Sequence, residues 1–600
     1  MATAKRLYLY TVSGVGLGLL LAATTIFIGL LLDRLGLDTS TVASGPANDS
    51  AARESLALAI AYVVVGLPLW LFHWALVERM VVGNGPAAAA ERQSILRAVY
   101  FGIVLVWLIA EAAASGSDLL REAICRPLGA TNDPYGYNPP NLSGSAAWLI
   151  VGLGAFAYHA WIRARDIRLG PTIKAEAAWW SRLFFYGFAF SAITAALIYG
   201  GSAITTVAQA LSGYANPANV QQSISGPGLV GSVELASAPW WVRPLVGALA
   251  AAFCYGVAWL GHWLYVSRLA ARNDEQGSDE RASRVRLTYF VLVVAVAVGY
   301  AVAAFGAALG VALRYVVGSW HSGFGQSALG EALGPLLAVL PLIAAWAWHR
   351  WRAAWEWYWQ SGSPLRAVRP MEYLTSLIGL AAFGGALVAF LEILAQKFVG
   401  TDSGIIASLD TWRSSAMTAV GVMVVGGVIW LWPWLAGQRR RALDVAGEAR
   451  STSRRTFLLV VGATTVLSGA SCLAFVVYRV TRVGVGLEST SLGSDVRMPL
   501  CVLVVAGSLL AYHAYWIRRD LNVPLPAEWP APVAPVAPVA ATATPAAPPV
   551  PSGAPASQAL ELVIVGPVGA DLEALRASLA EKLPDGYSMT VRPSGGAGRP

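Results

Sequence analysis

The sequence predicts an all-α integral membrane protein with about twelve transmembrane helices. Of the 600 residues, 56% are hydrophobic and only 13% are charged, whereas a soluble protein carries about 25% charged residues. The chain contains twelve long apolar segments, each near or above the roughly 20 residues that a helix needs to cross a bilayer. Lysine and arginine gather in alternate connections between these segments. The composition excludes a secreted disulfide scaffold, a disordered chain and a nucleic-acid-binding protein.

The apolar segments are expected to be helices, because backbone amides inside hydrocarbon must be hydrogen-bonded within their own segment. The first segment is longer than the apolar core of a signal peptide and resembles the later ones, so we expect a retained anchor. The segments occupy residues 7–32, 55–77, 98–120, 146–162, 183–211, 241–267, 287–313, 332–349, 371–396, 414–436, 456–478 and 498–517. Prolines at 68, 341 and 433 are expected to bend their helices.

The distribution of positive charge predicts the orientation. If the N-terminus is cytoplasmic, the inner connections and tails hold 31 of the 42 lysines and arginines, and the outer loops hold 11. Positively charged residues favour the cytoplasmic side of a membrane. We therefore expect both termini to be cytoplasmic, with the chain in a bacterial cytoplasmic (inner) membrane.

A unit of two helices is expected to occur six times in tandem. Each odd-numbered segment begins near an arginine followed by an aromatic residue, as in Arg6-Leu-Tyr-Leu-Tyr10; the other five arginines are Arg97, Arg182, Arg286, Arg369 and Arg455. Each even-numbered segment ends in an aromatic cluster around a histidine, which Pro433 replaces in the fifth unit. With two spans per unit, all copies share one orientation, so the six helical hairpins form a parallel repeat. The units span about 5–82, 97–169, 182–272, 286–358, 369–440 and 455–521.

These motifs resemble those of bacterial multi-pass membrane proteins built from tandem copies of an uncharacterised domain of unknown function. In that family Arg-x-x-Tyr opens one helix, and Pro-Leu-Trp-x-x-His-Trp lies near the end of the next. The segment Pro68-Leu69-Trp70-Leu71-Phe72-His73-Trp74 matches the second motif in full, and Pro433 departs from it. The resemblance covers roughly residues 5–521. It implies the architecture of paired helices and no particular activity.

The repeated histidine and its neighbouring indoles are the first candidate site. They are expected to form an aromatic belt at the membrane interface, where the histidine contacts a phosphate, a loop carbonyl or an arginine of the next unit. A lipid-headgroup or substrate site at the inner face, and axial ligation of haem, are the alternatives. The residues are His73, Trp74, His159, Trp161, His262, Trp263, His349, Trp351, His513 and Trp516.

Glu111 is the second candidate site, because a carboxylate inside hydrocarbon is costly and is a functional hypothesis by default. It lies 14 residues after Arg97 and is flanked by small residues that let a partner helix approach. A proton or cation site is one interpretation, and a glutamate near a wet outer loop is the other. The spacings of Gly14 and Gly18, and of Gly306 and Gly310, favour close helix packing.

After the membrane domain at 1–521, the composition changes abruptly. Residues 522–557 are rich in proline and alanine and are expected to form an extended linker. The last segment, 558–600, reads as a small cytoplasmic βαβ-like fragment with strands at 562–565 and 588–591 around a helix at 570–582. Such a fragment is expected to dock on a protein partner, to self-associate or to stay loosely ordered.

No catalytic triad, nucleotide fingerprint or thiolate pair is present, and the four cysteines are scattered, so we expect no enzyme activity, metal site or cofactor. The favoured function is a non-catalytic membrane scaffold or sensor, whose partners are the lipid bilayer and a protein bound by the tail. A transporter or channel with a polar pathway near Glu111 is the alternative. A haem-binding redox protein is the minor alternative.

Overall fold

The computed structural model describes residues 2–37, 46–83, 85–130, 141–169, 175–212, 238–319, 328–361, 363–399, 411–485 and 492–523. Across these ranges the regular structure is helical and contains no strand. The proline-rich linker and the βαβ-like fragment expected after residue 521 lie, apart from residues 522 and 523, outside the described residues.

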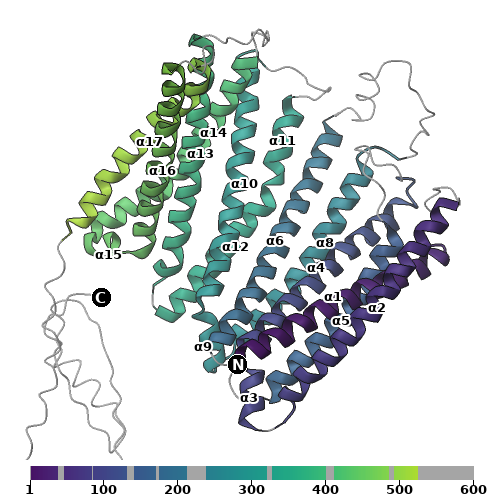
Figure 1. The fold of residues 1–600 in the computed structure, drawn as a ribbon. Coiled ribbons are helices and arrows are strands. Elements are labelled where there is room, and N and C mark those ends of the chain that lie inside the picture. Colours follow the sequence, from purple (N-terminus) through teal and green to yellow (C-terminus); the bar gives the residue numbers. More distant parts are fainter. Residues whose placement is uncertain are drawn as a thin grey trace, which may run out of the picture. The chain divides into compact units, whose positions relative to one another are not determined.

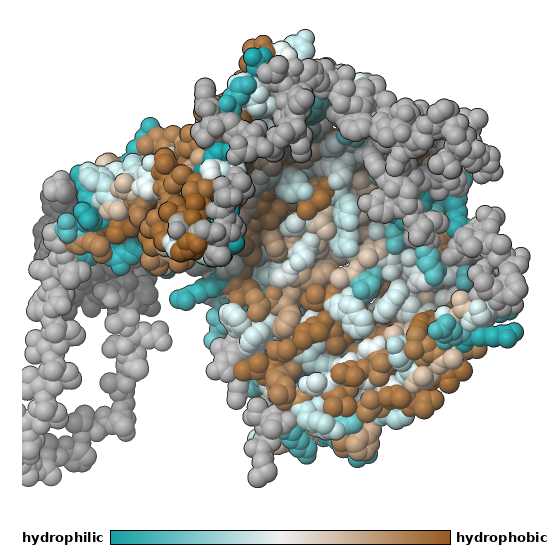
Figure 2. Space-filling view, turned by 45° about the horizontal axis from the view of Figure 1, so that its top comes forward, coloured by the Kyte–Doolittle hydropathy of each residue, from teal (hydrophilic) through white to brown (hydrophobic). Residues whose placement is uncertain are grey.

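Twelve candidate membrane spans occur in the described ranges, which confirms a multi-pass membrane protein. These spans carry many exposed leucine, valine, isoleucine and aromatic side chains. Figure 2 shows such apolar residues across the face that it draws. The long helices are α1 (Ala2–Arg34), α2 (Pro46–Val81), α4 (Ile95–Cys125), α5 (Leu142–Leu169), α6 (Ala175–Leu211), α8 (Val242–Ala270), α10 (Arg284–Val316), α11 (Ala328–Ala338), α12 (Leu340–Ser361), α13 (Leu365–Val399), α14 (Thr411–Leu443), α16 (Thr452–Gly484) and α17 (Leu492–Leu521).

One span is interrupted. Helices α11 and α12 form a single candidate span that breaks at Val339, directly before Leu340 and Pro341. Proline has no N–H to donate and its ring crowds the preceding turn, so a break here fits the expected bend. Pro68 and Pro433 instead lie within α2 and α14, which continue as helices through them.

Consecutive spans pack as six pairs, and the pairs then associate two by two. Helices α1, α2, α4 and α5 form a first bundle, α6, α8, α10 and α11–α12 a second, and α13, α14, α16 and α17 a third. Helix α4 contacts α6 and α8, and α10 contacts α13 and α14, so the second bundle lies between the other two. Figure 1 shows this order along the row of helices.

A short helix, which the hydropathy pattern does not predict, joins the second and third spans of each bundle. These helices are α3 (Pro86–Arg92), α9 (Glu275–Arg281) and α15 (Val445–Ala449). Asp274 caps α9 by accepting a 2.9 Å hydrogen bond from the Gly277 N–H, which lowers the pKa of its carboxyl below the ordinary value. Asp444 caps α15 in the same way through Gly447. The end of each bundle that carries its short helix is called the basic end below.

Glycines bring the second and third bundles into close contact. A Cβ atom on Gly421 of α14 would lie 2.5 Å from the Gly306 carbonyl oxygen of α10, so the two backbones touch. Gly306 and Gly310 thus have the packing role that their spacing indicated. In α1 the prediction from the glycine spacing was wrong. A Cβ atom on Gly16 would lie 2.6 Å from the backbone nitrogen of Trp70 in α2, whereas a Cβ atom on Gly18 would meet no described atom within 4 Å.

Candidate functional site

A buried arginine stands at the basic end of each bundle. Arg97, Arg286 and Arg454 are 0%, 1% and 0% exposed. Each lies in the first turns of the third span of its bundle, directly after the short connecting helix. A guanidinium removed from water in this way requires anionic and polar partners. We call these residues the central arginines.

In the first bundle, the central arginine contacts residues from three other spans. Arg97 Nε donates to Asp166 on α5 at 2.7 Å, and one of its terminal nitrogens lies 2.9 Å from Glu78 on α2. Its other terminal nitrogen donates to the Tyr10 hydroxyl of α1 at 3.4 Å. One side chain therefore links all four helices.

The other two bundles repeat this arrangement. Arg286 binds Glu356 of α12 through two hydrogen bonds of 2.9 and 2.8 Å, and donates to the Tyr186 hydroxyl at 2.7 Å. Arg454 contacts Asp520 of α17 at 2.6 Å and Tyr373 of α13 at 3.4 Å. Paired N–H···O bonds between guanidinium and carboxylate are the strongest form of this interaction.

The short helix supplies a second carboxylate to each cluster. Its glutamate accepts a hydrogen bond from the bundle's tyrosine, at 3.0 Å for Tyr10, 2.5 Å for Tyr186 and 2.8 Å for Tyr373. The same glutamate pairs with the arginine near the start of the first helix. These pairs are Arg6 with Glu91 at 2.6 Å, Arg182 with Glu280 at 2.7 Å and Arg369 with Glu448 at 2.9 Å. Each bundle thus holds a connected set of two arginines, a tyrosine and at least two carboxylates, which we call its arginine cluster.

Indole rings cover the central arginines. The guanidinium carbons lie 5.7, 5.1 and 5.0 Å from the ring centroids of Trp74, Trp263 and Trp434, within the range of a cation–π interaction. Trp74 and Trp263, expected at the membrane interface, are buried here instead. Trp161 and Trp351 are 56% and 58% exposed, as an interfacial belt requires.

The histidines of the second, fourth and sixth hairpins lie beside the arginine clusters. His159, His349 and His513 are at most 1% exposed, so a lipid headgroup does not reach them in this structure. Each ring Nδ1 is hydrogen-bonded to the carbonyl four residues earlier in its own helix, at 2.7–2.8 Å. In the first two bundles, Nε2 faces a tyrosine hydroxyl of the third span, Tyr100 at 3.4 Å and Tyr289 at 3.0 Å.

The third bundle lacks this tyrosine, because Phe457 occupies its place. His513 Nε2 and Trp430 Nε1 have no hydrogen-bond partner in the described structure. In the second bundle, the tyrosine hydroxyl serves both equivalent atoms: it lies 3.0 Å from His349 Nε2 and accepts from Trp259 at 2.9 Å. The missing hydroxyl therefore leaves His513 Nε2 unpaired. Among the described residues, Trp430 Nε1 is unpaired as well, as is the equivalent Trp70 Nε1 of the first bundle, where the tyrosine is present.

The histidines of the first and third hairpins have different surroundings. His73 Nε2 lies 3.2 Å from the Tyr8 hydroxyl, and His262 lies between Phe185 and Phe188 with ring centroids 4.6 Å apart in both cases. Haem ligation would use a free ring nitrogen. At His73, His159 and His349 both ring nitrogens are already hydrogen-bonded, so iron would have to displace a tyrosine.

The repeat pattern of the sequence indicates the arginines and histidines but not the carboxylates that pair with them. A signal for the glutamates exists: Glu-x-x-Ser-x-x-Arg occurs at Glu91–Arg97, Glu280–Arg286 and Glu448–Arg454. This register also shows that Arg454, one position before the expected Arg455, is the equivalent residue of the sixth hairpin. A carboxylate likewise follows His159, His349 and His513 by seven residues.

Glu111 lies apart from the three arginine clusters. It is a half-buried residue of α4, and it is close enough to Tyr255 of α8 for an electrostatic interaction. Five residues further along α4, a Cβ atom on Gly116 would lie 3.6 Å from the sulfur of Cys254 of α8. Glu111 has no hydrogen bond or ion pair with the residues that the structure describes.

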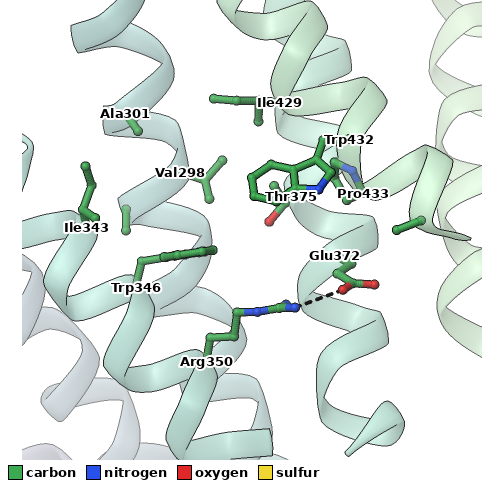
Figure 3. A pocket seen from close by; sticks show the side chains of 12 residues that line it. Val298, Ala301, Ile343, Trp346, Arg350, Glu372, Thr375, Ile429, Trp432 and Pro433 are labelled. Carbon is green, nitrogen blue, oxygen red and sulfur yellow. Dashed lines mark hydrogen bonds and ion pairs between the residues drawn. The ribbon is translucent and has the colours of Figure 1, made fainter.

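A cavity of about 280 Å³ lies between the second and third bundles, bordered by α10, α12, α13 and α14. Its wall is apolar, with Val298, Ile343 and Ile429 among its residues. Figure 3 shows Trp346 and Trp432 beside this space and the ion pair of Arg350 with Glu372 at one end, at 3.0 Å. We call this space the inter-bundle cavity.

One family model matches two segments of the chain. The model of a domain of unknown function (DUF5671) matches residues 6–135 and 369–508. This confirms the resemblance to proteins with a repeated uncharacterised domain. Both matches begin at the arginine that opens a bundle, the first and the third. No curated protein and no solved structure matches the chain.

Proposed function

We propose that this multi-pass membrane protein, which carries an uncharacterised domain twice, is a non-catalytic membrane scaffold or sensor. Its helical bundles would anchor the segment 522–600 at the cytoplasmic face, where that segment engages a protein partner. The proposal places both termini in the cytoplasm, because the basic end of each bundle would face inward under the positive-inside rule.

The arginine clusters carry this proposal. A transport pathway requires charged groups that face water or exchange partners. In the clusters, the central arginines are buried and each cluster carboxylate is held by at least two donors; Glu356, for example, pairs with both Arg286 and Arg352. Removing one member of such a set leaves an uncompensated buried charge. These groups are therefore suited to holding four helices in one arrangement.

Deletion of residues 524–600 tests the scaffold proposal. We expect the truncated chain to reach the membrane in normal amount and to lose in-cell cross-linking to its partner protein, since α17 ends at Leu521 before the deletion. A variant lacking only 558–600 separates the linker from the terminal segment. Unchanged cross-linking by both truncated chains would overturn the proposal.

Transport is the second candidate function, and the position of Glu111 is the observation that favours it. This carboxylate lies within a candidate span and, unlike the cluster carboxylates, has no ion pair among the described residues. If the protein conducts protons or cations through this place, Glu111→Gln should abolish flux in reconstituted vesicles. Glu54→Gln on the exposed side of α2 is the control. Equal flux in the wild type and Glu111→Gln would remove Glu111 from any pathway.

A further inference from the structure

The inter-bundle cavity occupies a place that aromatic side chains fill elsewhere in the chain. In the third hairpin, Phe185 and Phe188 of α6 pack on either side of His262 of α8. Phe185 also contacts Tyr265, with ring centroids 5.5 Å apart. These four rings close the space between α6 and α8.

The fifth hairpin carries much smaller or charged residues at the same four positions. Counted from Arg369, Glu372 and Thr375 correspond to the two phenylalanines. Counted from Trp434, Pro433 corresponds to the histidine and Ala436 to the tyrosine. All four line the cavity. Loss of the aromatic side chains thus leaves a space of about 280 Å³ that the neighbouring bundle does not fill.

The charged residues at the cavity also differ from the residues at the equivalent positions of other hairpins. Arg350 follows the buried histidine of the fourth hairpin, where the second and sixth hairpins have Ala160 and Ala514. Glu372 pairs with Arg350 at 3.0 Å and with Arg440 at 2.6 Å. Arg440 also pairs with Glu448 at 3.4 Å, and Glu448 pairs with Arg369 at 2.9 Å. Three guanidinium groups and two carboxylates leave a net positive charge at this end of the cavity.

Arg350 retains the capacity to bind an anion. Its guanidinium carries five N–H donors, and its hydrogen bond within the described structure is to Glu372. The side chain is 32% exposed. The opposite wall is apolar, and Trp432, which lies beside the cavity (Figure 3), is 73% exposed, so the cavity opens to the surface at this indole.

We propose that the inter-bundle cavity binds one anionic phospholipid of the surrounding bilayer. An acyl chain would lie along the apolar wall of α10, α12 and α14, and the phosphate would accept hydrogen bonds from Arg350. Basic pockets between transmembrane helices are suited to anionic headgroups. The inference depends on the membrane location and is independent of the role proposed for the tail.

Lipid retention by the purified full chain tests this inference. The protein is exchanged into mixed micelles containing phosphatidylglycerol or phosphatidylcholine, and bound lipid is counted by native mass spectrometry. We expect one phosphatidylglycerol to be retained in preference to phosphatidylcholine. Arg350→Ala, which installs the residue of the second and sixth hairpins, should weaken phosphatidylglycerol binding about fivefold, the effect of one basic residue at an anionic lipid.

Two further variants separate cavity filling from charge. Thr375→Phe and Ala436→Tyr restore the side chains of the third hairpin and should abolish retention of the bound lipid while leaving Arg350 in place. Arg366→Ala, an exposed arginine near the start of α13, is the matched control and should bind as the wild type does. Equal retention of phosphatidylglycerol and phosphatidylcholine by the wild type would overturn the proposal. So would phosphatidylglycerol retention that stays unchanged both in Arg350→Ala and in a filling variant that folds.

Discussion

Arg286 shows how a single side chain can hold four helices together. It is 1% exposed, it bonds to α12 and α6, and it lies under an indole of α8. Truncation would leave the Glu356 carboxylate with Arg352 alone. Because the penalty of an unpaired buried charge is large, Arg286→Ala should lower the free energy of unfolding by about 3–5 kcal/mol.

Thermal unfolding in detergent measures this effect. Arg284→Ala is the matched control, because Arg284 lies two residues earlier in α10 and is exposed. Equal unfolding temperatures for the two variants would show that the arginine clusters do not stabilise the fold.

Phe457 offers a stabilising change. Its ring centroid lies 5.8 Å from that of His513, close to the 5.6 Å between Tyr289 and His349. A hydroxyl added by Phe457→Tyr would meet the two unpaired atoms of His513 and Trp430. We expect a gain of about 1 kcal/mol for each hydrogen bond formed.

The reverse change is the control for this prediction. Tyr289→Phe should destabilise the second bundle, because it leaves the buried ring nitrogen of His349 without its partner. Unfolding temperatures that fall for both variants would contradict the assignment of the vacant hydroxyl position to Phe457.

At the residue scale, the sequence predicts which side chains recur but not what they contact. The arginines and histidines stand out because they are rare in apolar segments and evenly spaced. Their carboxylate partners lie on other helices, up to 98 residues away for Arg182 and Glu280. Spacing along the chain does not specify such pairs, because they depend on how the helices pack.

At the element scale, length and hydropathy suffice to predict the membrane helices. The twelve predicted spans correspond to the twelve candidate spans, although the helices extend several residues further at most ends. The helices α3, α9 and α15 were missed because five to seven residues are too few for a hydrophobic period to be recognised. Their capping residues, such as Asp274 and Asp444, were the available signal.

The contact between α10 and α14 gives a prediction for an element. A methyl group on Gly421 would lie 2.5 Å from the Gly306 oxygen and 2.6 Å from the Gly310 nitrogen, so Gly421→Ala must push the two helices apart. Overpacking of this kind costs about 1–3 kcal/mol. Thermal unfolding of the purified variant should report the loss.

Gly299→Ala on α10 is the matched control. A Cβ at Gly299 meets no atom within 4 Å in the described structure, and alanine is favoured over glycine inside a helix by roughly 0.5–1 kcal/mol. The two variants should therefore shift the unfolding temperature in opposite directions. A stabilised Gly421→Ala would show that the second and third bundles are not in backbone contact.

At the scale of the whole molecule, the grouping of hairpins into three bundles was not evident from the sequence. The hairpin signature of arginine and aromatic residues recurs six times, with a histidine in five of the copies. The signature of the bundle, Glu-x-x-Ser-x-x-Arg, ends at the central arginine of each of the three bundles, and the same pattern also occurs at Glu275–Arg281. The signature of the bundle consists of only three defined residues, the glutamate, the serine and the arginine, between the second and third spans. Its meaning follows from the contacts of Glu91, Glu280 and Glu448 with the first helix of each bundle.

The orientation of the molecule in the membrane is the last prediction. The positive-inside rule favours a cytoplasmic location for the basic ends, so the connection that holds α9 should face the cytoplasm and the end of α1 should face outward. Two variants measure this orientation, each with one cysteine in a chain from which the four native cysteines have been removed. One is Ala282→Cys, at an exposed residue after α9, and the other is Leu37→Cys, at an exposed residue after α1. A membrane-impermeant thiol reagent should label Leu37→Cys in intact cells and should label Ala282→Cys only after permeabilisation. The opposite pattern would place both termini outside, and the segment 522–600 would then be unable to engage a cytoplasmic partner.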